Sequence, residues 1–170
     1  MNSYVFIERL LPPDRIAKWI EKANALDWGD GTTFGDDPDY RKTLVTFVPV
    51  ESNEDTLAIK RFGIAAAGLL GIDVRPEGPD TLQFACYRPG DFYKTHSDDA
   101  IQHNESHEIR KLSVAVTLTD NATIILEDRE MPPMRAGSAL AFPSFRDHRV
   151  DACDDWRYSL VGWFPGPEWR

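Results

Sequence analysis

A histidine and an aspartate separated by one residue are the first side chains in this sequence that could hold a metal ion together. His96 and Asp98 follow a β-like segment, where alternation every second residue would direct both side chains to the same side. Taken alone the pair has a simpler interpretation, a loop histidine beside a solvated acid, because an acidic chain with four histidines can contain one H-x-D by chance.

His148 would supply a third ligand from a later segment of the chain. Two imidazoles and one carboxylate occupy one face of an octahedral Fe(II) and leave three positions open for a bidentate cosubstrate and dioxygen. On its own, His148 is equally compatible with a partly buried histidine hydrogen-bonded to a backbone carbonyl. The three residues together predict a non-haem iron site.

Arg157 follows His148 by nine residues, in a segment that reads as a strand. Arg157, Ser159, Val161 and Trp163 would share one face of this strand, and the residues between them would share the other. A buried guanidinium is costly unless a carboxylate meets it, and its planar fork suits bidentate capture of one. An internal salt bridge to one of the chain's own acids would satisfy Arg157 as well, so both possibilities stay open.

Two longer stretches resemble the prolyl 4-hydroxylase-like Fe(II)/2-oxoglutarate dioxygenases. Residues 87–98 read Tyr-Arg-Pro-Gly-Asp-Phe-Tyr-Lys-Thr-His-Ser-Asp, which resembles the family signature Y-x-x-G-x-x-Y-x-x-H-x-D. Residues 137–164 resemble the same family in their His-to-Arg spacing and in a tryptophan six residues after the arginine, as in the hypoxia-factor prolyl hydroxylases. The resemblance runs from about Thr81 to Phe164 and departs at 119–126, where the family's usual glycine pair is missing.

The resemblance implies a role for each of these residues. His96, Asp98 and His148 would bind Fe(II). Arg157 would pair with the distal carboxylate of 2-oxoglutarate, and Tyr87 would hydrogen-bond the same cosubstrate. The cofactors implied are Fe(II), 2-oxoglutarate and O2, with ascorbate as a candidate reductant.

Tyr93 and Trp163 match family positions on the substrate side of the iron, although core packing is the commoner role for aromatic residues on strands. The implied reaction is hydroxylation of a C–H bond with release of succinate and CO2. The substrate would be a peptide or protein side chain, as for prolyl hydroxylases, with a free amino acid or another small molecule as the alternative.

The elements needed to position these side chains predict an α+β fold with a double-stranded β-helix, or jelly roll, as its core. An amphipathic helix is expected after Pro12 and a second over Leu57–Leu70, with Ser52 and Asp55 as its cap, both packed on one sheet. We expect strands near residues 43–48, 81–87, 112–118, 122–126, 138–142, 148–150 and 157–164. The 170 residues fit one domain.

Composition excludes several functions. A net charge of −9 without a basic stripe argues against nucleic acid, and the longest uncharged apolar run, residues 62–72, is too short to cross a membrane. We expect a cytoplasmic protein, and the sequence carries no signal for an oligomeric state. The acidity of the segments 97–110 and 24–39, which we expect to frame the substrate, hints at a basic substrate.

Two other classes of function compete with the oxygenase. A zinc site at His103 and His107 has helical spacing but lacks the glutamate that metalloproteases place directly after the first histidine. A non-catalytic jelly-roll module would need no complete ligand set, so the presence of all three ligands and Arg157 argues against it.

Overall fold

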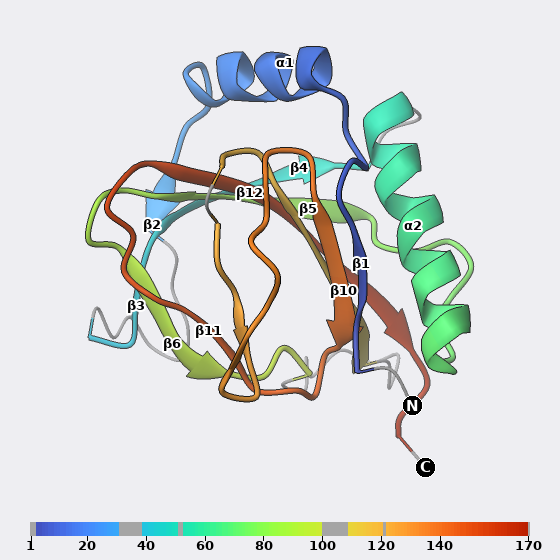
Figure 1. Ribbon diagram of the computed structural model, residues 1–170. Coiled ribbons are helices and arrows are strands. Elements are labelled where there is room, and N and C mark those ends of the chain that lie inside the picture. The colour runs from blue at the N-terminus through green and yellow to red at the C-terminus, as the bar shows by residue number, and fades with distance from the viewer. Residues whose placement is uncertain (1–2, 31–38, 51–52, 100–108, 121, 170) are drawn as a thin grey trace.

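Two antiparallel sheets and two helices make up the fold (Figure 1). The computed structural model describes residues 3–30, 39–50, 53–99, 109–120 and 122–169. In spatial order the larger sheet contains β1 (Val5–Ile7), β10 (Ala139–Pro143), β7 (Ile109–Thr117), β12 (Arg157–Gly166), β5 (Thr81–Tyr87), β4 (Leu44–Pro49) and β2 (Gly29–Asp30). The smaller sheet contains β3 (Arg41–Lys42), β6 (Phe92–His96), β11 (His148–Val150), β8 (Ile125–Leu126) and β9 (Arg129–Glu130). The α+β jelly-roll prediction is confirmed.

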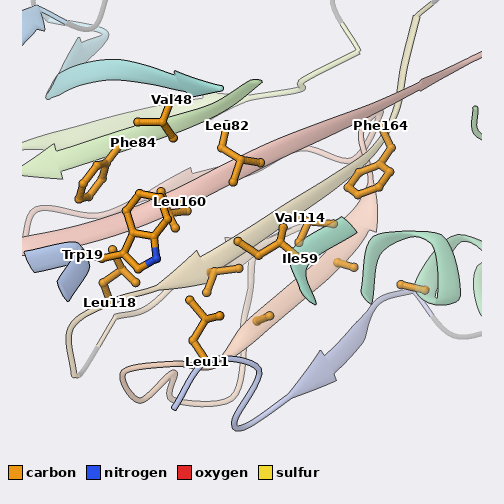
Figure 2. Close-up of a cluster of buried hydrophobic side chains, with 14 of the residues drawn as sticks. Leu11, Trp19, Val48, Ile59, Leu82, Phe84, Val114, Leu118, Leu160 and Phe164 are labelled. Atoms are coloured by element: carbon orange, nitrogen blue, oxygen red, sulfur yellow. The ribbon is translucent and has the colours of Figure 1, made fainter. Parts of the chain in front are cut away.

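Helices α1 (Pro13–Ala23) and α2 (Glu54–Leu70) cover the outer face of the larger sheet (Figure 1). The indole of Trp19 on α1 meets the ring of Phe84 on β5 edge-on, with 5.8 Å between ring centroids. Ile59 on α2 belongs to the same buried cluster (Figure 2). The prediction that both helices pack on one sheet is therefore confirmed. No helix within the described residues is long and apolar enough to cross a membrane.

Strand alternation assigns the two faces of the larger sheet to different tasks. On β5 and β12, Leu82, Phe84, Leu160 and Phe164 point to the helices and form the core. The residues between them point the other way and line a pocket between the sheets; these are Gln83, Tyr87, Arg157, Ser159, Val161 and Trp163. The four residues predicted to share a strand face, with Arg157 at its start, therefore all face this pocket.

The helix ends follow local signals, with one correction. Pro13 occupies the first turn of α1, where its missing N–H costs nothing. The predicted cap of α2 was wrong: Asn53, not Ser52, caps the helix, and its side chain accepts hydrogen bonds from the backbone N–H groups of Asp55 (3.1 Å) and Thr56 (3.0 Å). Ser52 lies outside the described residues. Gly71 ends the helix in the left-handed region, at φ 68°.

Several strand bounds differ from the predicted ones because pairing partners decide them. β7 begins at Ile109, three residues early, since β12 continues to Gly166 and pairs with residues 109 and 110. The predicted strand over 122–126 shrinks to Ile125–Leu126, and Ala122 makes only an isolated bridge to Met134. The short strands β1, β2, β3 and β9 were not predicted, whereas β6 is the β-like segment expected to lead into His96.

Gly63 allows α2 to lie directly on the sheet. A Cβ atom at this position would overlap the ring of Phe164, which is fully buried, whereas a Cβ on Gly68 of the same helix would meet nothing. We expect Gly63→Ala to lower the free energy of unfolding by about 1–3 kcal/mol through overpacking. Gly68→Ala should raise it by about 0.5–1 kcal/mol, because alanine favours helix. Urea unfolding of both variants checks this, and equal effects would contradict it.

Candidate metal centre

The three predicted ligands meet at one end of the smaller sheet. His148 on β11 lies directly opposite His96 on β6, with imidazole centroids 4.2 Å apart. The backbone N–H of Asp98 donates to the carbonyl of Ser144 (2.8 Å), which holds the aspartate near the end of β10. Its two carboxylate oxygens lie 3.6 Å from Nε2 of His96 and 3.4 Å from Nε2 of His148.

Both imidazoles present the same nitrogen to the centre. Nδ1 of His96 lies 2.8 Å from the carbonyl of Lys94, and Nδ1 of His148 lies 3.0 Å from the carbonyl of Arg146. A carbonyl can only accept a hydrogen bond, so Nδ1 carries the proton in each ring. The lone pair of each Nε2 is therefore free to bind a metal, and the backbone fixes the ring orientation.

The charge state of the cluster suits a divalent cation. Burial by itself would raise the pKa of Asp98, but the imidazoles of His148 and His96 and the hydroxyl of Ser113 hold it well below its usual range. Burial lowers the pKa of His148, and the neighbouring His96 lowers it further against the opposing effect of Asp98. At neutral pH the cluster thus offers an anionic carboxylate and a neutral His148 imidazole, which are the forms that bind metal.

Asp98 is supported by two serines that were not predicted from the sequence. The Ser113 hydroxyl donates to Oδ2 of Asp98 (2.7 Å), and its oxygen lies 2.9 Å from the hydroxyl of Ser144. Such hydrogen bonds orient a carboxylate ligand and are often as important as the ligand itself. A polar residue inside the apolar run Leu112–Thr117 was the available signal for Ser113.

Arg157 lies in the pocket next to this cluster without a carboxylate partner among the described residues. Arg157 is 7% exposed, Nη1 donates to the carbonyl of Thr123 (3.1 Å), and Nε has no hydrogen-bond partner in the described part of the chain. Burial lowers the pKa of the Arg157 guanidinium, which measures the cost of holding this charge away from water. The internal salt bridge considered as an alternative is not formed within the described residues.

The remaining predicted residues line the same pocket, which has a volume of about 350 Å³. Tyr87 lies directly opposite Arg157 across β5 and β12, and the guanidinium lies 5.5 Å from the tyrosine ring centroid. The Tyr93 ring stacks on His96 with centroids 3.5 Å apart. Trp163 lies opposite Ser113 across β12 and β7, and its buried indole N–H has no hydrogen-bond partner among the described residues.

This set of donors fits Fe(II) and 2-oxoglutarate. One candidate ligand atom from each of His96, Asp98 and His148 lies within 4.8 Å of the others, and two nitrogens with one oxygen match the facial triad of iron oxygenases. The orphaned Nε of Arg157 in the same pocket matches a cosubstrate carboxylate. His103 and His107, the predicted zinc alternative, lie outside the described residues.

Residues 82–165, which contain every residue of the predicted site, match the sequence model of a family described as the 2OG-Fe(II) oxygenase superfamily. The chain belongs to this superfamily. The predicted family is confirmed, and the oxygenase is a 2-oxoglutarate-dependent enzyme that uses Fe(II), 2-oxoglutarate and O2. No curated protein is similar enough in sequence to match it.

Solved structures share the oxygenase's fold at low sequence identity. A prolyl-4-hydroxylase from Pseudomonas putida is 20% identical and covers 99% of this chain and 95% of its own, with a TM-score of 0.75. A second structure is a prolyl hydroxylase from Trichoplax adhaerens in complex with a peptide fragment of the hypoxia inducible factor oxygen degradation domain. It is 17% identical, the match covers 96% of this chain and 84% of the Trichoplax chain, and the TM-score is 0.69. The α-ketoglutarate-dependent carbocyclase SnoK from nogalamycin biosynthesis is 15% identical. The match covers 96% of this chain and 79% of the SnoK chain, also with a TM-score of 0.69.

Proposed function

We propose that this oxygenase hydroxylates a C–H bond of its substrate, with His96, Asp98 and His148 holding Fe(II). Arg157 and Tyr87 would hold 2-oxoglutarate. The observation that carries the proposal is the buried Arg157 guanidinium, which lines one pocket with the three candidate ligands and pairs with no described carboxylate. An internal cation of this kind is stable when a ligand carboxylate completes its hydrogen bonds.

Iron bound at this site would supply the coupled oxidation of 2-oxoglutarate and the substrate by dioxygen. The protein's own residues do the positioning. Asp98 would supply negative charge to the cation, and the backbone carbonyls of Lys94 and Arg146 keep the two imidazoles in the ligating tautomer. Arg157 would bind the distal carboxylate of the cosubstrate and so orient its keto acid end toward the three candidate ligands.

Peptide or protein side chains are the substrates that we favour, and small molecules are the alternative. The Trichoplax relative was solved with a peptide, whereas SnoK belongs to nogalamycin biosynthesis, so this fold accommodates both kinds of chemistry. Tyr93 and Trp163 would contact the substrate, since both line the pocket. The cytoplasmic location and the single domain stay predictions from the sequence.

Succinate formation tests the proposal directly. Purified protein reconstituted with Fe(II) should convert 2-oxoglutarate to succinate in air, slowly without substrate, and the reaction should stop when a chelator removes the metal. Protein treated in the same way without iron is the control. Absence of both 2-oxoglutarate binding and succinate formation in iron-loaded, folded protein would refute the proposal.

A further inference from the structure

The pocket lining carries more positive charge than one cosubstrate carboxylate requires. Arg41, Arg110 and Arg157 all line it, while the described lining contains a single carboxylate, that of Asp98. Asp98 is already engaged by Ser113 and the two imidazoles. If Arg157 holds 2-oxoglutarate, then Arg41 and Arg110 remain without a salt bridge to a carboxylate among the described residues, and Asp98 is the one anionic neighbour of Arg110 there.

Arg41 is buried and incompletely hydrogen-bonded. Arg41 is 9% exposed, its guanidinium lies 4.4 Å from the centroid of the Tyr93 ring, and Nε has no hydrogen-bond partner among the residues that the structure describes. The one hydrogen bond of its side chain within the described residues, from Nη2 to Oε1 of Gln83, is long at 3.4 Å. A guanidinium buried against a neutral amide and a ring has lost water without gaining a counter-charge.

Arg110 completes a second group of donors on the same side of the pocket. Its guanidinium lies 3.9 Å from the centroid of the Trp163 ring, so the aromatic face supports the cation while its N–H groups keep their hydrogen-bonding capacity. The indole N–H of Trp163 is itself buried, and no described residue accepts a hydrogen bond from it. Burial lowers the pKa of Arg110, and among the neighbouring charges Arg41 lowers it further while Asp98 and Tyr93 raise it.

These donors share one requirement, which is an acceptor that carries negative charge. Two arginines that repel each other in a partly dry pocket are stabilised by an anion placed between their donors. A carboxylate suits such a site because each guanidinium can bind it through parallel N–H bonds, with the indole N–H available as a further donor. No described side chain supplies that carboxylate.

We propose that the substrate of this oxygenase bears a carboxylate, which Arg41 and Arg110 bind on the Tyr93 and Trp163 side of the pocket. The inference rests on the proposed function, since it assigns the 2-oxoglutarate carboxylate to Arg157. It replaces the basic substrate that we expected from the acidity of segments 97–110 and 24–39 with an acidic one. The charge that a substrate meets is that of the pocket lining, and this lining is cationic although the protein as a whole is acidic.

Paired probes that differ only in this charge test the proposal. Protein loaded with Mn(II) and 2-oxoglutarate, which does not turn over, is titrated calorimetrically with the twenty N-acetyl-L-amino acids and with their carboxamides. A second arm uses acetylated, amidated heptapeptides with a central proline flanked by either glutamate or glutamine. The first arm detects a small-molecule carboxylate and the second an acidic peptide.

We expect at least one carboxylate probe to bind about 10-fold to 100-fold more tightly than its neutral counterpart. Arg41→Gln and Arg110→Gln should each bring that ratio close to one while leaving the affinity for 2-oxoglutarate within about twofold of wild type. Arg61→Gln, an exposed arginine on α2, is the matched control and should preserve the ratio. A purely structural role for Arg41 or Arg110 would not remove discrimination between the paired probes.

Three results would overturn the proposal. The first is equal binding of charged and neutral probes, and the second is binding of no probe in either arm to protein that does bind 2-oxoglutarate. The third is a loss of 2-oxoglutarate affinity in Arg41→Gln, which would assign this residue to the cosubstrate. If a variant does not fold, the proposal is still tested by the ratio of the affinities of wild-type protein for each carboxylate probe and its neutral counterpart. Wild-type protein that binds no 2-oxoglutarate refutes the proposed function itself, which is a different outcome.

Discussion

Replacing His148 with alanine is expected to abolish iron retention. The variant loses one of three ligands and leaves Asp98 with a single imidazole neighbour, His96. Changes to residues that merely orient a ligand already lower metal affinity by about 10-fold to 100-fold, so loss of a ligand should exceed the upper end of that range. The measurement is metal content after equilibrium dialysis against a calibrated chelator.

His107→Ala provides the control for His148→Ala, because it removes an imidazole of the competing zinc hypothesis and leaves the three predicted ligands intact. We expect His107→Ala to bind iron like the wild type. Iron retention by His148→Ala together with metal loss in His107→Ala would favour the zinc hypothesis over the oxygenase site. Circular dichroism of both variants separates loss of the metal from loss of the fold.

Replacing Arg157 with glutamine should raise the dissociation constant for 2-oxoglutarate by about 100-fold. Arg157 is 7% exposed, and the described residues give its guanidinium a backbone carbonyl but no carboxylate, so the cosubstrate would be its counter-charge. Iron affinity should change little, because no metal-binding atom is removed. Calorimetric titration of the Mn(II)-loaded variant with 2-oxoglutarate measures the effect.

Arg157→Lys sharpens this prediction. A lysine keeps the positive charge but loses the planar fork, so it should recover only part of the lost affinity. Arg61→Gln, far from the pocket on the outer helix, should bind 2-oxoglutarate normally. Unchanged affinity in Arg157→Gln would mean that the carbonyl of Thr123 is the true partner of Arg157 and that the cosubstrate is held elsewhere.

The arginines that line the pocket are expected to bind different anions. Arg157 is assigned to 2-oxoglutarate, and Arg41 with Arg110 is assigned to the substrate. If the assignment holds, the corresponding variants separate cleanly, since the first loses the cosubstrate and the others lose only discrimination between charged and neutral substrate probes. Comparing the three variants in the same titration therefore tests the division of the pocket.

The candidate ligands, the family and the strand face that carries Arg157 could be predicted from residue types and their spacing alone. His96 and Asp98 are close in the chain, and the face that carries Arg157 follows from two-residue alternation within one strand. These features are local, so a motif or a period can reveal them. The strands over 81–87 and 157–164 were also predictable locally, because runs rich in β-branched and aromatic residues are bounded there by proline, glycine and aspartate.

Which other polar residues join the site depends on contacts between distant parts of the chain. Ser113 reaches Asp98 across 15 residues, and Arg41 reaches Gln83 across 42. Strands of two residues, such as β3, which carries Arg41, have no period to detect and exist because a neighbouring strand supplies their hydrogen bonds. The cationic side of the pocket is therefore a product of strand pairing, and it changed the expected charge of the substrate from positive to negative.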